Sequence, residues 1–222
     1  MMKTVLVTGG SRGIGKAIVQ KFEAEGYHTF APSHQELNLD SVESVDAFIE
    51  AHRKAGFDVI INNAGINEIS LLENITDDQL DRMMQINLLS PIRLLRGLVG
   101  PMKENKYGKI VNIGSIWAVV SKEGRLVYSA TKNALHGVTN TLALELGPYN
   151  ILVNTVCPGY VLTELTRKNN TVEEIEIISS TLPLRRMAQP EEIANFVYFL
   201  ASENNTFITG QKIAIDGGFT IQ

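Results

Sequence analysis

Residues 8–15 read Thr8-Gly9-Gly10-Ser11-Arg12-Gly13-Ile14-Gly15 and stand between a short β-branched run at 3–7 and a segment with helical spacing of apolar residues. Glycine permits a sharp turn and a close approach of the backbone to a bound group. A helix that starts directly after such a turn presents unpaired N–H groups, which attract phosphate. A strand, a glycine turn and a helix in this order therefore predict a dinucleotide-binding unit.

Short apolar runs alternate with segments of helical periodicity from one end of the chain to the other. The runs are apolar almost throughout, as strands are when both faces of a parallel sheet are covered. We expect strands at 3–7, 27–31, 59–61, 110–113, 152–156 and 213–215. The alternation predicts an α/β fold, namely a single-domain, doubly wound (Rossmann-like) parallel sheet over residues 1–222 with helices on both faces.

One connection between expected strands is unusually short. Only residues 32–36 separate the second expected strand from the apolar run Leu37-Asn38-Leu39. A parallel crossover normally needs about a dozen residues or more, most often a helix. A helix is therefore missing here, and we expect the edge strand to be short or irregular.

The composition argues against several classes of protein. The net charge is −4 and no basic block is present, so we expect no nucleic-acid partner. No apolar stretch approaches the roughly 20 residues of a membrane span, and the first residues lack a signal-peptide pattern. The single Cys157 cannot form an internal disulfide, and the four histidines show no metal-ligand spacing. We expect a cytoplasmic protein without a metal or a membrane partner.

Tyr128 and Lys132 are four residues apart, so on a helix they share a face. A free tyrosine has a pKa near 10, and a nearby ammonium group lowers that pKa. Such a pair can exchange a proton near neutral pH, although the same spacing also occurs on ordinary surface helices. Ser115 ends an apolar run thirteen residues earlier, where a serine could equally cap a helix.

Taken together and in this order, the motifs resemble the short-chain dehydrogenase/reductase family, whose glycine turn reads Thr-Gly-x-x-x-Gly-x-Gly. The resemblance covers nearly the whole chain and implies hydride transfer between a nicotinamide cofactor and a carbonyl or alcohol, with Tyr128 as general acid/base. The other matching segments are Asn62-Asn63-Ala64-Gly65, Asn87, Ser115, Tyr128-Ser129-Ala130-Thr131-Lys132 and Pro158-Gly159-Tyr160-Val161-Leu162-Thr163.

The resemblance also implies a role for each residue. Ser115 would bind the substrate oxygen, Lys132 the ribose hydroxyls, and Asn87 a water that links Lys132 to solvent. The catalytic set would be Asn87, Ser115, Tyr128 and Lys132. The cofactor-binding set would be Gly9, Ser11, Arg12, Gly13, Ile14, Gly15, Ser33, His34, Asn38, Leu39, Asn63, Ala64, Gly65, Tyr128, Lys132, Pro158, Gly159, Val161 and Thr163.

The end of the second expected strand discriminates between NADP(H) and NAD(H). A carboxylate there accepts a hydrogen bond from the 2′-hydroxyl of NAD and repels the 2′-phosphate of NADP. Residues 31–34 contain no acid, and Ser33 and His34 stand in its place. Arg12 supplies a permanent cation that suits a phosphate. We therefore favour NADP(H), with NAD(H) as the alternative.

The family often closes a mobile lid over its substrate, and residues 164–184 occupy that position here, where a plain surface helix is the alternative interpretation. Residues 182–194 resemble the end of 3-oxoacyl-carrier-protein reductases. We therefore expect a small-molecule or acyl-thioester carbonyl substrate. Trp117 could line the substrate pocket or pack in the core.

Members of the family commonly form homotetramers or homodimers, which implies contacts near 91–99, 134–146 and 213–219. Two other functions share the motifs. A nucleotide-sugar epimerase or dehydratase would usually carry a larger C-terminal substrate domain than this chain offers. A non-catalytic NAD(P)-binding sensor would be expected to have lost the tyrosine or the lysine, and both are present.

Overall fold

A six-stranded parallel sheet forms the centre of the computed structural model, which describes residues 2–222. The strand order is β2-β1-β3-β4-β5-β6, and every neighbouring pair is parallel. The doubly wound α/β prediction is confirmed, and each expected strand is present to within two residues at either end. The strands are β1 (Thr4–Val7), β2 (His28–Phe30), β3 (Val59–Asn62), β4 (Gly108–Ile113), β5 (Ile151–Pro158) and β6 (Lys212–Ile215).

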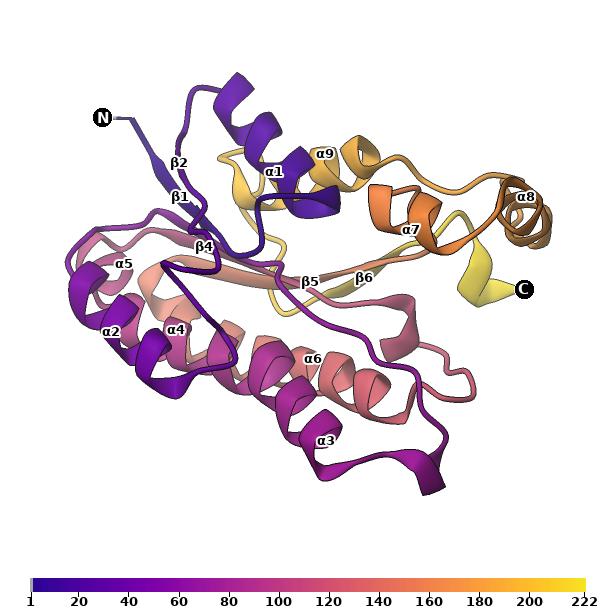
Figure 1. Cartoon of the computed structure of the whole chain (residues 1–222). Coiled ribbons are helices and arrows are strands. Elements are labelled where there is room, and N and C mark those ends of the chain that lie inside the picture. The colour runs from indigo at the N-terminus through magenta and orange to yellow at the C-terminus, as the bar shows by residue number, and fades with distance from the viewer. Residues whose placement is uncertain (1) are drawn as a thin grey trace.

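Helices cover both faces of the sheet (Figure 1). α1 (Gly13–Ala24) and α9 (Pro190–Ala201) pack together on one face, while α2 (Val42–His52), α4 (Ser90–Leu98) and α6 (Leu126–Leu146) lie on the other. Because both faces are covered, every residue of β3, β4 and β5 is buried. Each face has its own apolar core, one around Ile18 and Phe22 and the other around Phe48 and Leu94.

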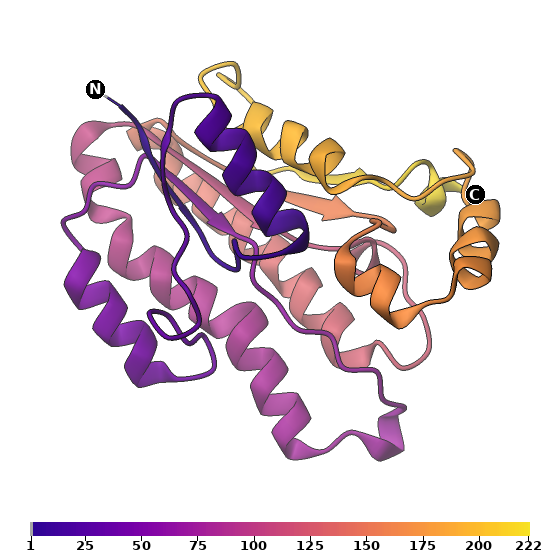
Figure 2. The same cartoon turned by 45° about the horizontal axis from the view of Figure 1, so that its top comes forward.

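Shorter helices connect these layers. α3 (Asp77–Met84) continues through a π-helix at Gln85–Leu89 into α4, and α5 (Gly100–Asn105) leads to β4. α7 (Glu164–Asn169) and α8 (Val172–Thr181) lie beyond one end of the sheet, near the C-terminus (Figure 2). Single 3₁₀ turns occupy Leu72–Asn74, Ile116–Ala118, Gly147–Tyr149 and Phe219–Ile221. No helix within residues 2–222 combines the length and the apolar character needed to cross a membrane.

The short connection after β2 forms no edge strand, which corrects the expectation for residues 37–39. Among the described residues the sheet ends at β2, and the chain runs from Phe30 directly to the N-cap of α2 at Ser41. The side chains of Leu37 and Leu39 are only 6% and 7% exposed and join the core beneath α2. Without a crossover helix the run cannot reach a position beyond β2, so its leucines serve as core residues of a loop.

The direction of winding reverses between β1 and β3. The chain leaves β1 through α1 on one face to reach β2, then returns through α2 on the opposite face to place β3 on the other side of β1. Connections that depart to opposite faces leave a crevice above the carboxyl ends of the two strands. The glycine turn follows β1, so it lies at this crevice.

The buried loop can be tested by truncating Leu39. Leu39→Ala should lower the free energy of unfolding by about 2–3 kcal/mol, because it removes packed methyl groups and leaves a cavity. Urea unfolding followed by circular dichroism measures the change. Leu144→Ala, at a side chain that is 80% exposed, is the matched control and should change stability by less than about 0.5 kcal/mol. Equal effects of the two substitutions would show that the loop is not part of the core.

Candidate active site

The glycine turn leaves the N-terminus of α1 open. Gly9 and Gly13 have positive φ values of 67° and 54°, which favour glycine. A Cβ atom on Gly15 would lie 2.1 Å from the carbonyl oxygen of Gly9, so only glycine fits there. No side chain caps α1 and no acid occupies its first turn, whereas α3 and α8 begin with complete capping boxes. The unpaired N–H groups and bare glycines fit a pyrophosphate.

Thr8 and Asn63 join the ends of β1 and β3 beside this turn. The Thr8 hydroxyl accepts hydrogen bonds from the backbone N–H groups of Asn63 at 3.0 Å and Ala64 at 3.1 Å. In return the Asn63 side-chain amide donates to the carbonyl oxygens of Thr8 at 2.9 Å and Gly9 at 3.1 Å. Asn63 therefore fixes the turn through its side chain, a structural role in addition to the predicted contact with the cofactor.

Gly65, Asn87 and Lys132 meet at the floor of the crevice. A Cβ atom on Gly65 would lie 3.2 Å from both the Asn87 Oδ1 and the Lys132 Nζ. The Asn87 side chain bonds the backbone N–H of Ile66 at 2.8 Å and its carbonyl at 2.9 Å. Asn87 lies in the π-helix Gln85–Leu89. Four residues later, Pro91 has no N–H group, so it cannot donate a hydrogen bond to the backbone carbonyl of Asn87. The side chain of Asn87 is therefore committed to the loop after β3.

Tyr128 and Lys132 lie on α6 and face Ser115 at the end of β4. Lys132 is only 3% exposed, and its ammonium group donates to the carbonyl of Ile113 at 2.8 Å. Its Nζ lies 5.7 Å from the centre of the Tyr128 ring. Burial lowers the pKa of Lys132 to about 8. The predicted tyrosine, lysine and serine are thus brought together, with the lysine beneath the tyrosine.

The pKa of Tyr128 moves opposite to the expectation from sequence. Burial raises this pKa, while a hydrogen bond with the Ser115 hydroxyl and the positive charge of Arg125 oppose the rise. Burial is the largest cause, and the Lys132 ammonium group donates its hydrogen bond to the Ile113 carbonyl rather than to the phenol. Arg125, which sequence reasoning did not single out, is the cation that acts on Tyr128.

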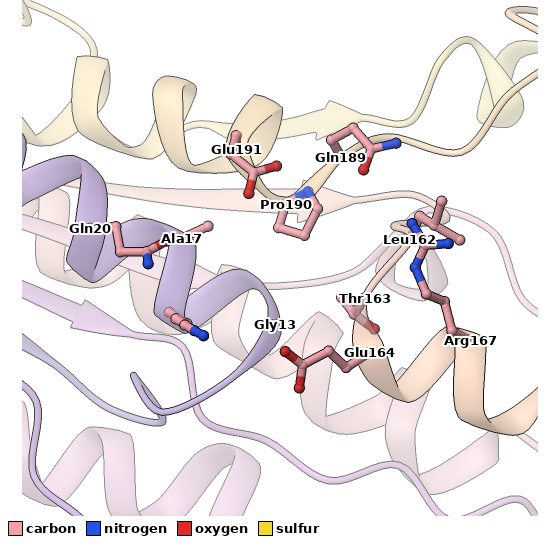
Figure 3. A pocket seen from close by; sticks show the side chains of 11 residues that line it. Gly13, Ala17, Gln20, Leu162, Thr163, Glu164, Arg167, Gln189, Pro190 and Glu191 are labelled. Carbon is pink, nitrogen blue, oxygen red and sulfur yellow. The ribbon is translucent and has the colours of Figure 1, made fainter.

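The segment after β5 closes the crevice on its other side. Gly159 is confined, since a Cβ atom there would lie 2.7 Å from the Cα of Asp216. Thr163 caps α7 by accepting from the N–H of Thr166, and its methyl group faces Gly13. Behind this contact is a cleft of about 250 Å³ between the starts of α1, α7 and α9 (Figure 3). Pro158 and Val161 are buried beside it.

The loop after β2 contains an acid that the sequence pattern did not reveal. The carboxylate of Glu36 accepts a hydrogen bond of 2.7 Å from the backbone N–H of Ser33, which lowers the pKa of Glu36. Ser33, His34 and Arg12 are exposed, and Arg12 occupies the N-cap of α1. Asn38 is half-buried, but the Leu39 side chain packs into the core, so only the Leu39 backbone is available to a ligand.

A buried chain of polar side chains supports the site and was also missed. Asn62, Asn112 and Thr155 are neighbours in register across β3, β4 and β5. Asn62 donates to Asn112 at 2.8 Å, Asn112 donates to Thr139 of α6 at 2.9 Å, and Thr139 bonds Thr155 at 2.7 Å. These bonds fix α6, and with it Tyr128, against the sheet. Asn112 within an otherwise apolar run was the signal in the sequence.

Two further residues of the predicted cofactor-binding set lie in the glycine turn and at the start of the helix that follows it. Ser11 is exposed in the turn and Ile14 packs against the core at the start of α1. Within residues 2–222 no three His, Cys, Asp or Glu side chains are placed to hold a metal ion. The fold and the arrangement of a tyrosine, a serine and a buried lysine at one crevice are typical of a nucleotide-dependent enzyme.

Comparison with known proteins agrees with this class. Residues 31–220 match the family described as enoyl-(acyl carrier protein) reductase, and residues 3–45 match short chain dehydrogenase. The chain belongs to the short-chain dehydrogenase/reductase family. It is an NAD(P)-dependent oxidoreductase that acts on CH–OH or C=O groups.

Similar proteins span the whole chain. The 3-oxoacyl-(acyl-carrier-protein) reductase FabG of Buchnera aphidicola subsp. Acyrthosiphon pisum is 34% identical, over 97% of this chain and 96% of its own length. The D-beta-hydroxybutyrate dehydrogenase of Rhizobium meliloti is 30% identical over the full length of both. The solved structure "ElxO with NADP Bound" is 31% identical, covers 100% of both chains and has a TM-score of 0.92. The structure of 4-hydroxyisoleucine dehydrogenase complexed with NADH is 30% identical over 99% of both chains, with a TM-score of 0.91.

The polar chain predicts a stability effect at Asn112. Asn112→Ala should lower the free energy of unfolding by about 1–3 kcal/mol, because it leaves the Asn62 amide buried without its partner and removes one of the two hydrogen bonds of the Thr139 hydroxyl. It should also lower kcat, since α6 is less firmly held. Denaturant unfolding and steady-state kinetics measure the two effects. Asn133→Ala, at an exposed position of the same helix, is the control; a loss of similar size there would remove the special role of Asn112.

Proposed function

We propose that this enzyme catalyses the NADP(H)-dependent reduction of the carbonyl group of a 3-oxoacyl compound, and the reverse oxidation of the alcohol. The observation that carries the proposal is the convergence of Ser115, Tyr128 and Lys132 beside the open N-terminus of α1. The similarity to 3-oxoacyl-(acyl-carrier-protein) reductases supports the substrate class. An epimerase and a non-catalytic sensor are less well supported, because the similar proteins over the full chain are named as reductases and dehydrogenases.

The bound nicotinamide would supply or accept the hydride. The backbone N–H groups of Gly13–Gly15 would hold the pyrophosphate, with Ser11 and Ile14 in the same turn. Lys132 would bind the ribose hydroxyls, and Asn63, Ala64 and Gly65 would line the floor beneath them. Pro158, Gly159, Val161 and Thr163 would face the nicotinamide end.

Protein side chains would handle the proton. Tyr128 would donate its hydroxyl proton to the carbonyl oxygen while Ser115 hydrogen-bonds the same oxygen. The protonated form of Tyr128 is favoured by its burial, which suits a proton donor in the direction of reduction. Lys132 would return the proton through a water at Asn87. Because the Asn87 side chain is bonded to Ile66, the backbone carbonyl is the group we assign to that water.

Cofactor preference would depend on a balance of charges at the end of β2. Arg12 and the Ser33 hydroxyl would bind the 2′-phosphate of NADP, whereas the Glu36 carboxylate would repel it. The structure of ElxO with NADP bound supports this preference. The NADH complex of 4-hydroxyisoleucine dehydrogenase shows that a similar fold also binds the other cofactor. We therefore assign NADP(H), with Glu36 as the group that limits the preference.

The surroundings of the site suggest further features of the proposal. Residues 164–184 include α7 and α8, and we assign them as the lid because α8 has no buried residue.

A largely apolar cleft of about 540 Å³ between α4 and α6 supports a homodimer or homotetramer through the predicted faces at 91–99 and 134–146. A cytoplasmic location stays a prediction from the sequence.

Tyr128→Phe should abolish turnover while leaving cofactor binding intact. Loss of the proton donor should lower kcat by about 100-fold or more. NADPH oxidation with acetoacetyl thioesters measures turnover, and the fluorescence of bound NADPH measures affinity. Tyr149→Phe, at an exposed ring near the end of α6, is the control. Near-normal turnover in Tyr128→Phe would overturn the assignment.

Arg12→Ala and Glu36→Gln should shift cofactor preference in opposite directions. Removal of the guanidinium should weaken NADPH relative to NADH by about 10- to 100-fold, as expected for a hydrogen bond to a charged group. Removal of the carboxylate charge should strengthen NADPH several-fold. Kd values for both cofactors, compared with Arg53→Ala on the exposed surface of α2, provide the measurement. An unchanged NADPH to NADH ratio in Arg12→Ala would count against the assignment.

A further inference from the structure

Three aromatic rings form one wall beside the reacting groups. Trp117, two residues after Ser115, meets Tyr160 at a centroid distance of 6.3 Å and Phe219 at 6.1 Å. Tyr160 and Phe219 are 5.5 Å apart, and all three pairs are close to perpendicular. Tyr160 directly follows Gly159, and Phe219 begins the last 3₁₀ turn. Rings that brace one another edge to face form a rigid apolar surface.

Arg125 stands over this wall. Its guanidinium carbon lies 5.9 Å from the centre of the Trp117 ring, within the range of a cation–π contact. Arg125 is the N-cap of α6, three residues before Tyr128, so the two side chains leave the same side of the first turn. The cation is therefore held near the hydroxyl that would meet the substrate carbonyl.

The backbone before Arg125 is fixed by contacts with the loop after β3. Gly124 has a φ of 74°, and a Cβ atom on it would lie 2.7 Å from the Cγ2 of Ile69. The Gly124 carbonyl accepts a hydrogen bond of 3.1 Å from the N–H of Ser70. Both features tie the loop before α6 to the loop after β3, so Arg125 starts from a fixed point.

The charge of Arg125 has no acidic partner among residues 2–222. The ion pairs in that part of the chain involve Lys3, Lys21, Arg53, Arg82 and Arg186 instead. Its positive charge instead acts on the phenols beside it, opposing the rise in the pKa of Tyr128 and of Tyr160 that burial causes. A half-buried, positioned guanidinium without a carboxylate partner can accept one from a ligand.

We propose that Arg125 binds a carboxylate of the substrate, so that the preferred substrate is a short oxo acid in its free form, with the reacting carbonyl a few bonds from the carboxylate. The proposal rests on the proposed function and narrows its substrate class. The guanidinium lies 5.9 Å from the Trp117 ring, and its N–H groups suit a planar, bidentate partner. A single cation matches one carboxylate. The aromatic wall would cover the short apolar part of the acid. A thioester has no charge at this position and would leave Arg125 unpaired.

The test compares substrates that differ only in charge. Acetoacetate and its methyl ester carry the same reacting ketone, and an acetoacetyl thioester represents the carrier-bound form. We expect the wild-type enzyme to show a higher kcat/KM for acetoacetate than for either neutral compound. Arg125→Gln should lower kcat/KM for acetoacetate by about 10- to 100-fold, mainly through KM, as expected for loss of a charge-assisted hydrogen bond. The values for the methyl ester should fall by no more than about threefold, the part due to the loss of the Arg125 charge beside Tyr128.

Two controls separate the binding role from general effects. Lys122→Gln removes a positive charge from an exposed position in the same loop and should leave all three substrates unchanged. Arg125→Lys should recover part of the activity on acetoacetate, since a cation is restored without the bidentate geometry. Thermal unfolding of each variant, with and without NADPH, checks that the fold and cofactor binding are retained.

The outcomes are distinct. A wild-type preference for the thioester or the methyl ester, or an equal loss on all substrates in Arg125→Gln, would overturn the role of Arg125 and leave the reductase function standing. Absence of NADPH oxidation with every substrate would instead overturn the proposed function itself. Selective loss of acetoacetate turnover in Arg125→Gln alone supports the carboxylate site.

Discussion

The sheet changes its direction of winding between β1 and β3, and the hydrogen bonds of Thr8 and Asn63 hold the two strand ends together there. Neighbouring connections leave this point toward opposite faces, so within residues 2–222 no connecting helix covers the carboxyl ends of β1 and β3. A glycine turn can then place the start of α1 beside the crevice without obstruction. The open α1 N-terminus, the floor at Gly65 and the position of Lys132 all follow from this one arrangement.

Burial of a charged amine beneath the crevice requires support from its surroundings. Lys132 is nearly inaccessible, and the Ile113 carbonyl is its hydrogen-bond partner. An ammonium group in such a place loses hydration, which explains the lowered pKa. The polar chain from Asn62 to Thr155 prevents α6 from relaxing away from the sheet and thus from exposing the amine. The hydrogen bonds that stabilise the fold thus keep the Lys132 amine in an environment that disfavours its charge.

Much of the fold was predictable from the sequence because buried parallel strands leave continuous apolar runs, as at 5–7 and 59–61. The order of the site motifs also indicated which strand ends lie at the crevice. The features that could not be predicted from the sequence depend on how separate helices, strands and loops are placed relative to one another. The bond of Asn62 to Asn112 requires the register of β3 and β4, and the bond of Glu36 to Ser33 requires the shape of the loop after β2. The rise in the pKa of Tyr128 likewise depends on its burial, which follows from how the elements pack.

Several of the features that the sequence did not predict follow from the short loop after β2. Because no helix stands between β2 and residues 37–39, the chain turns back at once and places the Glu36 carboxylate on the Ser33 amide. The same shortening sends Leu37 and Leu39 into the core and leaves the edge of the sheet at β2. Apolar packing within the loop thus replaces a crossover helix, and the same loop places a negative charge beside the position expected for the adenosine ribose. With the cofactor assignment proposed above, the preference would therefore depend on the length of this connection as well as on the residue at the strand end.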